Sequence, residues 1–144
     1  MRLIYICGPF RAPTAWQVEQ HVRRAEVLAL AVWKLGAVAV CPHTMSRHFH
    51  GEMEDWHWLQ GDLELLARCD ALITVGNWEE SVGALGEVAY ARDQDIPVFH
   101  ALDTLAEWLT QQPLYRQMVP MVLTTAAGRQ PFPMETAQEK KARP

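Results

Sequence analysis

The stretch Leu3-Ile4-Tyr5-Ile6-Cys7, closed by Gly8-Pro9, decides the fold of this chain. A short, continuous apolar run bounded by turn residues is typical of a strand buried on both faces of a parallel sheet. Three further runs of this kind follow, at residues 37–41, 70–75 and 96–99. The sequence therefore predicts four buried strands.

Helical patterns separate and follow these strands. In residues 14–35, apolar side chains from Val18 to Trp33 recur at steps of three and four and form one stripe, with Thr14 as the predicted N-cap and Gly36 as the stop. A polar loop is expected at residues 43–54, and further helices at residues 55–67, 81–93 and 103–109, the last capped by Asp103. This alternation of strands and helices predicts right-handed crossovers and a parallel sheet covered by helices on both faces.

Length and charge limit the organisation and the partners. The 144 residues, 49% hydrophobic and 21% charged, fit one globular domain. We expect it to span residues 1–122, followed by a mobile, Pro- and Lys-rich tail at residues 123–144. The net charge is −4, and residues 1–123 alone carry −6. Such an acidic body argues against a nucleic-acid polymer as the partner, although a small nucleotide needs only a few local donors.

The cysteines and the hydropathy indicate the compartment. Cys7, Cys41 and Cys69 cannot all pair within one chain and show no CxxC spacing. We interpret them as reduced, buried thiols of a cytoplasmic protein. No apolar run reaches the length of a membrane span, so we expect no membrane partner.

Topology predicts where a site would lie. In open parallel sheets, ligands bind outside the carboxyl ends of the strands, at the point where the strand order reverses. This rule selects the residues that follow the first three strands, at residues 8–11, 43–51 and 76–87.

The third of these segments contains a helix start and an acid. Ser81 is the predicted N-cap, and Gly83 would let an anion approach the free backbone N–H groups of the first turn. Glu87 lies on a helix that is small and apolar on most sides. It therefore belongs either to a solvent-exposed strip or to the crevice.

Other polar residues also have two interpretations. Tyr5 could place its hydroxyl at the crevice floor or be a core aromatic with one hydrogen bond. Arg11 suits a phosphate but could instead be solvated. Asp62 lies within a predicted helix although aspartate is a poor helix former, so it has either a functional role or a plain surface position. The histidine-rich loop matches no standard metal-ligand spacing, so we expect no metal. It could be a polar loop over the crevice, or His43 or His48 could contact a ligand.

Together these residues resemble the nucleoside 2-deoxyribosyltransferase superfamily over roughly residues 1–110. The opening Ile4-Tyr5-Ile6-Cys7-Gly8-Pro9-Phe10-Arg11 is similar to the first-strand motif of the family, and Gly61-Asp62-Leu63-Glu64 resembles its Asp-Leu helix motif. The most specific element is Cys69-Asp70-Ala71-Leu72-Ile73 followed by Ser81-x-Gly83-x-x-Gly86-Glu87, where the family carries its nucleophilic glutamate.

Two positions refine the resemblance. Transferases carry an acid six residues before the glutamate, which holds the sugar 5′-hydroxyl, whereas this chain has Ser81. A serine there resembles the Rcl-type 2′-deoxynucleoside 5′-phosphate N-hydrolases, and a serine at a helix N-terminus suits a phosphate. As a whole, the chain resembles small, often phage-borne members of the superfamily. Pro9 departs from those hydrolases, which have a phosphate-binding serine at this position.

The resemblance implies a flavodoxin-like sandwich with strand order 2-1-3-4 and an N-glycosidase that acts on nucleoside 5′-monophosphates. Glu87 would be the nucleophile, Tyr5 would orient it, and Asp62 would contact the sugar or assist proton transfer. Neither a metal nor an organic cofactor would be needed. The remaining expected substrate-binding residues are Gly8, Pro9, Phe10, Arg11, His43, Trp78, Ser81 and Gly83. Base transfer by a deoxyribosyltransferase and nucleotide sensing without turnover remain alternatives.

The tryptophans suggest an assembly. The chain has six of them, a high number for one small domain to cover. Trp16, Trp56, Trp58 and Trp108 lie on or beside helices that would coat the sheet. We expect a homodimer in which such surfaces pair and which, as the resemblance implies, completes the site near its interface.

Overall fold

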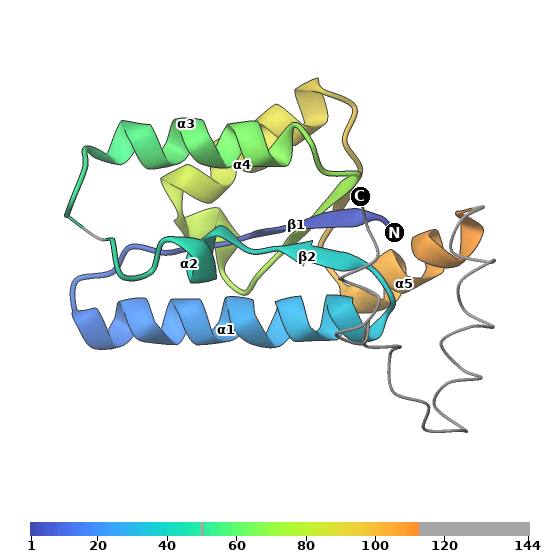
Figure 1. Ribbon diagram of the computed structural model, residues 1–144, viewed down its shortest axis with the longest axis horizontal. Coiled ribbons are helices and arrows are strands. Elements are labelled where there is room, and N and C mark those ends of the chain that lie inside the picture. Colours follow the sequence, from blue (N-terminus) through green and yellow to red (C-terminus); the bar gives the residue numbers. More distant parts are fainter. Residues whose placement is uncertain (50, 113–144) are drawn as a thin grey trace, which may run out of the picture.

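Four parallel strands form the centre of the protein. The structure is a computed structural model in which residues 1–49 and 51–112 are described. The strand order is β2-β1-β3-β4, as predicted. Figure 1 shows the sheet between two layers of helices, which is the expected flavodoxin-like three-layer arrangement. The strands are β1 (Leu3–Cys7), β2 (Val38–Val40), β3 (Ala71–Thr74) and β4 (Val98–Phe99).

Five α-helices and one short 3₁₀-helix are found in the described residues. Their bounds are α1 (Ala15–Lys34), α2 (Pro42–Met45), α3 (Asp55–Leu66), η1 (Trp78–Glu80), α4 (Val82–Asp93) and α5 (Leu102–Gln111). None of these helices is both long enough and apolar enough to cross a membrane.

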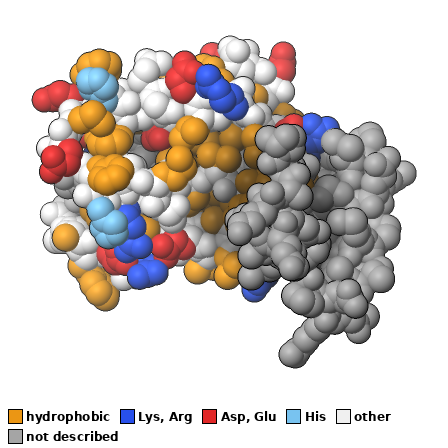
Figure 2. Space-filling model, in the orientation of Figure 1, with side chains coloured by type: hydrophobic (Ala, Val, Ile, Leu, Met, Phe, Trp, Pro, Cys, Tyr) orange, Lys and Arg blue, Asp and Glu red, His pale blue; other side chains and the backbone are white. Residues whose placement is uncertain are grey.

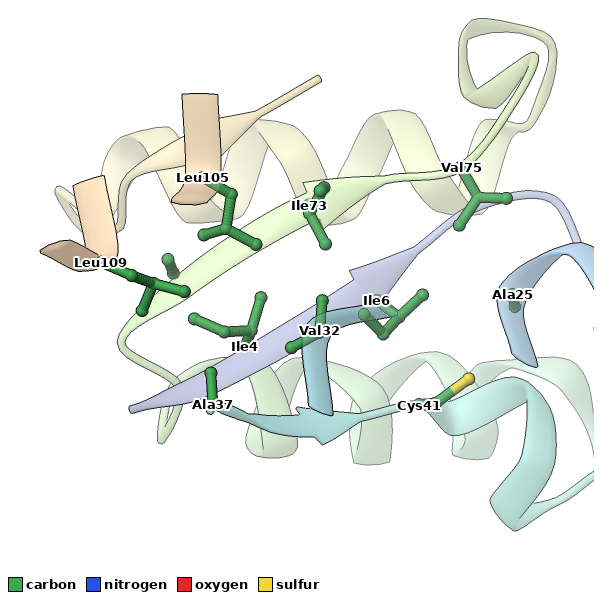
Figure 3. Packing of buried hydrophobic residues seen from close by; sticks show 11 residues of the cluster. Ile4, Ile6, Ala25, Val32, Ala37, Cys41, Ile73, Val75, Leu105 and Leu109 are labelled. Atoms are coloured by element: carbon green, nitrogen blue, oxygen red, sulfur yellow. The ribbon is translucent and has the colours of Figure 1, made fainter. Parts of the chain in front are cut away.

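The alternation of side chains along β1 divides the interior into two cores. Ile4 and Ile6 point to the face covered by α1 and α5, where Val32, Leu105 and other apolar side chains pack on them (Figure 3). Tyr5 and Cys7 point to the opposite face, which α3 and α4 cover. Because successive strand residues alternate in this way, a polar group at position 5 or 7 must face α3 and α4.

The helix caps explain where two of the helices begin. Thr14 precedes α1 and its hydroxyl oxygen accepts a hydrogen bond from the Gln17 backbone N–H at 3.3 Å. Ser81 precedes α4 and accepts from the Ala84 backbone N–H at 3.3 Å. Both caps were predicted, and each satisfies one of the backbone donors left free at a helix start. Gly36, with φ at +80°, follows α1 in the left-handed conformation expected of a helix stop.

The structure corrects three expectations about the elements. The last helix begins at Leu102, so Asp103 lies in its first turn rather than at the cap, where an acid still favours the positive end of the helix. The segment expected to be a loop from residue 43 begins inside a helix, because Pro42 supplies the fixed φ that suits a first helical position. Trp33, expected on the apolar stripe of α1, is half exposed.

Cys7, Cys41 and Cys69 are buried and free, as expected of reduced thiols. The predicted domain boundary at residue 122 and the predicted tail lie outside the described residues.

Candidate active site

A cavity of about 400 Å³ lies at the carboxyl ends of β1 and β3. Its lining includes Gly8, the residue after β1, and Asn77, three residues after β3. The strand order reverses at this point, because β2 and β3 flank β1 on opposite sides. The cavity therefore lies where ligands bind in open parallel sheets, and all three segments that the topology rule selected contribute to it.

Most of the predicted site residues meet in this cavity. Those that line it are Tyr5, Gly8, Pro9, Phe10, Arg11, His43, Asp62, Ser81, Gly83 and Glu87. They come from β1, α2, α3, α4 and the loop after β1.

Glu87 and Tyr5 form the buried floor. Glu87 is only 9% exposed as a residue and lines the cavity, so this acid belongs to the crevice and not to a solvent strip. Tyr5 is fully buried, and its hydroxyl donates a hydrogen bond to Oε1 of Glu87 at 3.0 Å. The second carboxyl oxygen of Glu87 is not used by this contact. The pair can therefore hold the carboxyl in one orientation while Oε2 remains available for another partner.

Burial dominates the electrostatics of Glu87. It raises the pKa of this carboxyl to about 7, and the negative charge of Asp62 adds to the rise. Hydrogen bonds from the Cys7 thiol and the Tyr5 hydroxyl lower the pKa and partly oppose burial. Glu87 therefore changes its charge near neutral pH, in the range useful to an acid, a base or a nucleophile.

Asp62 is the second carboxyl group of the cavity. It lies on α3, where Leu63 and Leu66 on neighbouring helical positions pack into the core. Burial raises the pKa of Asp62 to about 6. Two carboxyl groups with raised pKa values in one cavity are a common arrangement for general acid–base or nucleophilic chemistry.

The start of α4 forms one end of the cavity. Ser81, Val82, Gly83 and Ala84 line it, so the first backbone turn of a twelve-residue helix borders the open space. A Cβ atom at Gly83 would lie 3.4 Å from Leu59 Cδ2, which is ordinary van der Waals contact between α4 and α3. The positive end of the helix favours an anion here. Glu80 also lines the cavity one residue before Ser81, and its Oε1 accepts a hydrogen bond from Asn77 at 3.3 Å.

The loop after β1 is tightly packed. A Cβ atom at Gly8 would lie 2.9 Å from Val75 Cβ, closer than two such atoms approach, so the tips of β1 and β3 require glycine here. Arg11, expected to be solvated or to bind phosphate, forms an ion pair with Asp55 at 2.9 Å across the cavity rim. Both side chains are more than half exposed, so the pair contributes little to stability and can exchange partners.

His43 is a neutral part of the wall. Its Nε2 lies 3.1 Å from the Pro9 carbonyl oxygen, which can only accept, so this nitrogen carries the proton. Burial lowers the pKa of His43, which keeps the ring uncharged at neutral pH. The Phe10 ring packs edge-on against it, with centroids 6.0 Å apart. The two rings form an apolar surface suited to a flat ligand.

Trp78 is the predicted residue that the structure places elsewhere. Its ring stacks on His100, with centroids 5.2 Å apart and planes within 12°, and it is not part of the cavity lining. The indole packs against the core between the sheet and helices α3 and α4, because η1 places it away from the opening of the cavity. Trp58, one of the tryptophans expected near a subunit interface, lines the cavity. Its spacing of four from Asp62 on one helix was the sequence signal for this position.

Two further lining residues, His21 and Arg24, come from α1 and were not predicted. They lie in the middle of a long helix, outside the segments that follow the strands, and only the packing of α1 beside β1 brings them to the cavity. Within residues 1–49 and 51–112, no group of three or more His, Cys, Asp or Glu side chains is arranged to hold a metal ion.

Fold and cavity together define a flavodoxin-like α/β domain with two titrating carboxyl groups at its topological switch point. The chain belongs to the family described as Domain of unknown function (DUF7768), which matches residues 2–101, from the residue before β1 to the residue before α5.

Solved structures are also similar to this chain. No curated protein matches the sequence. Among solved structures, the chain is similar to a 2-deoxyribosyltransferase from the psychrotolerant bacterium Bacillus psychrosaccharolyticus, with 22% identity and a TM-score of 0.49. That similarity covers 67% of this chain and 69% of the other.

Proposed function

We propose that this protein cleaves the N-glycosidic bond of a nucleoside or deoxynucleoside 5′-monophosphate, with Glu87 as the nucleophile. The observation that carries the proposal is the buried Glu87 carboxyl, held by Tyr5 at 3.0 Å on the floor of a cavity that contains a second carboxyl group. A purely structural role would not require a buried acid that faces an open cavity, because burying a carboxylate costs free energy.

In the proposed reaction, ionised Glu87 attacks the anomeric carbon of the sugar through Oε2. The bond between this carbon and the base nitrogen breaks, and its electron pair leaves with the base. Asp62, when protonated, supplies the proton that neutralises the departing base. Water then attacks the anomeric carbon of the glycosyl ester and gives a proton to the Asp62 carboxylate, which releases the sugar phosphate and restores both the Glu87 carboxylate and the protonated Asp62. Tyr5 keeps Oε1 occupied throughout and limits the rotation of the nucleophile.

The start of α4 supports a phosphate at the 5′ end of the sugar. The free backbone N–H groups of its first turn and the Ser81 side chain border the cavity. Arg11 would exchange its exposed partner Asp55 for the phosphate. Phe10 and His43 would form the wall against which the base stacks.

One observation favours a second function, base exchange on free nucleosides. Glu80 lines the cavity directly beside Ser81, and its carboxylate would accept a hydrogen bond from a sugar 5′-hydroxyl but would repel a phosphate. In that reaction a second base, in place of water, would attack the glycosyl ester.

The test uses the full chain and a panel of nucleosides and their 5′-monophosphates, each with and without a second free base, with product bases separated by chromatography. Free base released from monophosphates supports the proposal, and new nucleosides formed only with a second base indicate a transferase. Binding without release of base by the wild type would overturn both enzymatic functions and indicate a nucleotide sensor. Glu87→Gln is the matched inactive control, because glutamine can still accept the Tyr5 hydrogen bond.

A further inference from the structure

The wall formed by α1 carries a donor and an acceptor that the proposed reaction does not use. His21 and Arg24 both line the cavity. They are three residues apart on α1, so their side chains lie next to each other on one face of the helix. Phe10, His43 and Ser46 line the same side of the cavity, from the loop after β1 and from α2 and its end.

The hydrogen-bonding character of the two residues follows from their surroundings. Nδ1 of His21 lies 3.1 Å from the Phe10 carbonyl oxygen. A carbonyl can only accept, so Nδ1 carries a proton, and in the tautomer with its single proton on Nδ1 the Nε2 atom presents a lone pair. Arg24 has only donors, and within the described residues it forms no ion pair, whereas the adjacent Arg23 is bound to Glu19 and Glu26 at 2.9 and 2.7 Å. Arg24 is thus a cation available to a ligand.

The position of the sugar determines which part of the substrate would lie against the α1 wall of the cavity. Glu87 and the start of α4 lie on the α3 and α4 side of the sheet, and α1 lies on the other side (Figure 1). A sugar with its anomeric carbon at Glu87 and its 5′ end at Ser81 has only the α1 and α2 side left for its base. The edge of the base therefore approaches His21 and Arg24.

We propose that His21 and Arg24 select bases with a lactam edge, a ring carbonyl beside a ring N–H, as in 6-oxopurines and in uracil or thymine. Arg24 donates to the carbonyl oxygen, and Nε2 of His21 accepts from the ring N–H. Adenine and cytosine present the reverse order, an amino donor beside a ring-nitrogen acceptor, and would set donor against donor and lone pair against lone pair. This inference rests on the proposed function for the position of the sugar.

The same contact would assist bond cleavage. When the base departs with the bonding electron pair, a lactam base places much of the negative charge on its exocyclic oxygen. A guanidinium at that oxygen forms a charge-assisted hydrogen bond that strengthens as the charge develops. Arg24 would therefore raise turnover as well as select the base.

Matched substrates test the selection. Inosine and adenosine 5′-monophosphates differ at the lactam or amidine edge and hardly in size, and so do the deoxyuridine and deoxycytidine 5′-monophosphates. We expect kcat/KM to favour the lactam member of each pair by about tenfold, since the wrong edge sets donor against donor and lone pair against lone pair. Arg24→Gln should reduce this preference to less than about threefold, whereas Arg92→Gln, at the far end of α4, should leave it unchanged.

A binding measurement separates failure of this inference from failure of the proposed function. Calorimetry with the Glu87→Gln protein and the same four nucleotides needs no turnover, and it should show the same preference. Release of base without a lactam preference would overturn the inference and leave the proposed function standing. A lactam preference in binding without any release of base would support the inference about His21 and Arg24 and overturn the proposed function. If Arg24→Gln weakens inorganic phosphate binding and leaves base preference intact, Arg24 is a phosphate ligand and the inference is wrong.

Discussion

Tyr5 and Glu87 are 82 positions apart, yet the Tyr5 hydroxyl donates a hydrogen bond to the Glu87 carboxyl in the protein interior. Burial and the charge of Glu87 raise the pKa of Tyr5 far above its ordinary range, so the phenol stays protonated and remains a donor at every physiological pH. The carboxyl is therefore held by a permanent donor on one oxygen and faces a cavity with the other.

The first prediction concerns turnover. Glu87→Gln should lower kcat by several orders of magnitude, because an amide cannot act as the covalent nucleophile. Far-UV circular dichroism should be unchanged, since glutamine fills the same space and still accepts from Tyr5. Glu64→Gln, on the exposed side of α3, is the matched control and should keep full activity. Near-normal activity of purified Glu87→Gln would remove Glu87 from its role.

The second prediction concerns stability and pH. The folded-state pKa of Glu87 is about 7 against an ordinary value of 4.5, so the folded protein binds more protons than the unfolded chain between these pH values. The contribution of Glu87 to the free energy of unfolding should therefore be greatest below pH 4.5, and it should be lost as the pH rises through 7. Glu87→Gln should remove this loss and stabilise the protein at pH 8 by roughly 2–3 kcal/mol. Urea denaturation of the wild type and of Glu87→Gln at pH 5 and pH 8 measures this difference in stability. An equal difference at the two pH values would contradict the raised pKa of Glu87.

The third prediction concerns the pH dependence of the rate. Ionised Glu87 requires a pH near or above 7, whereas a protonated Asp62 requires a pH near or below 6. If Asp62 gives its proton to the leaving base, kcat/KM should follow a bell with its maximum between pH 6 and 7. Asp62→Asn should then lower the maximum and abolish the alkaline limb. A wild-type rate that only rises with pH would limit Asp62 to contacts with the sugar.

The fourth prediction separates phosphate from hydroxyl recognition. Ser81→Asp and Ser81→Asn both keep a residue that caps helices well, so both should fold. The aspartate sets a negative charge against the phosphate, and we expect it to reduce kcat/KM for monophosphates by at least about tenfold relative to the neutral asparagine variant. Glu80→Gln should raise kcat/KM for monophosphates, because it removes a negative charge beside the phosphate. Free nucleosides cleaved better than monophosphates by the wild type would refute the choice of substrate.

The fifth prediction is a homodimer. Trp16 is 72% exposed, Trp56 is 61% exposed, and Val82 and Leu85 on the neighbouring α4 are also exposed. Figure 2 shows hydrophobic side chains on the surface at the end of the molecule where α1 and α3 begin. We propose that a second copy covers part of this surface, because exposed apolar area of this kind marks interaction sites. Light scattering should give twice the chain mass of 16.4 kDa. Trp56→Glu should give the mass of one chain, and an active wild-type monomer would contradict the proposal.

Local signals in the sequence were sufficient for the architecture. Apolar runs bounded by Gly and Pro marked the strands, and Thr14 and Ser81 marked two helix starts, because caps and periodicity act over a few residues and do not depend on distant packing. The alternation of elements then restricted the sheet to parallel pairing and placed the cavity at its carboxyl edge.

The tertiary structure alone decided which side chains face the cavity. The sequence of α4 is apolar on most sides and could not tell whether Glu87 points to solvent or to Tyr5. It could not separate Trp78, which stacks on His100, from Trp58, which lines the opening. Likewise His21 and Arg24 carry no local mark of function, and they reach the site only because α1 packs beside β1. The direction of a side chain on a buried helix is set by the elements packed against it, and those lie far away in sequence.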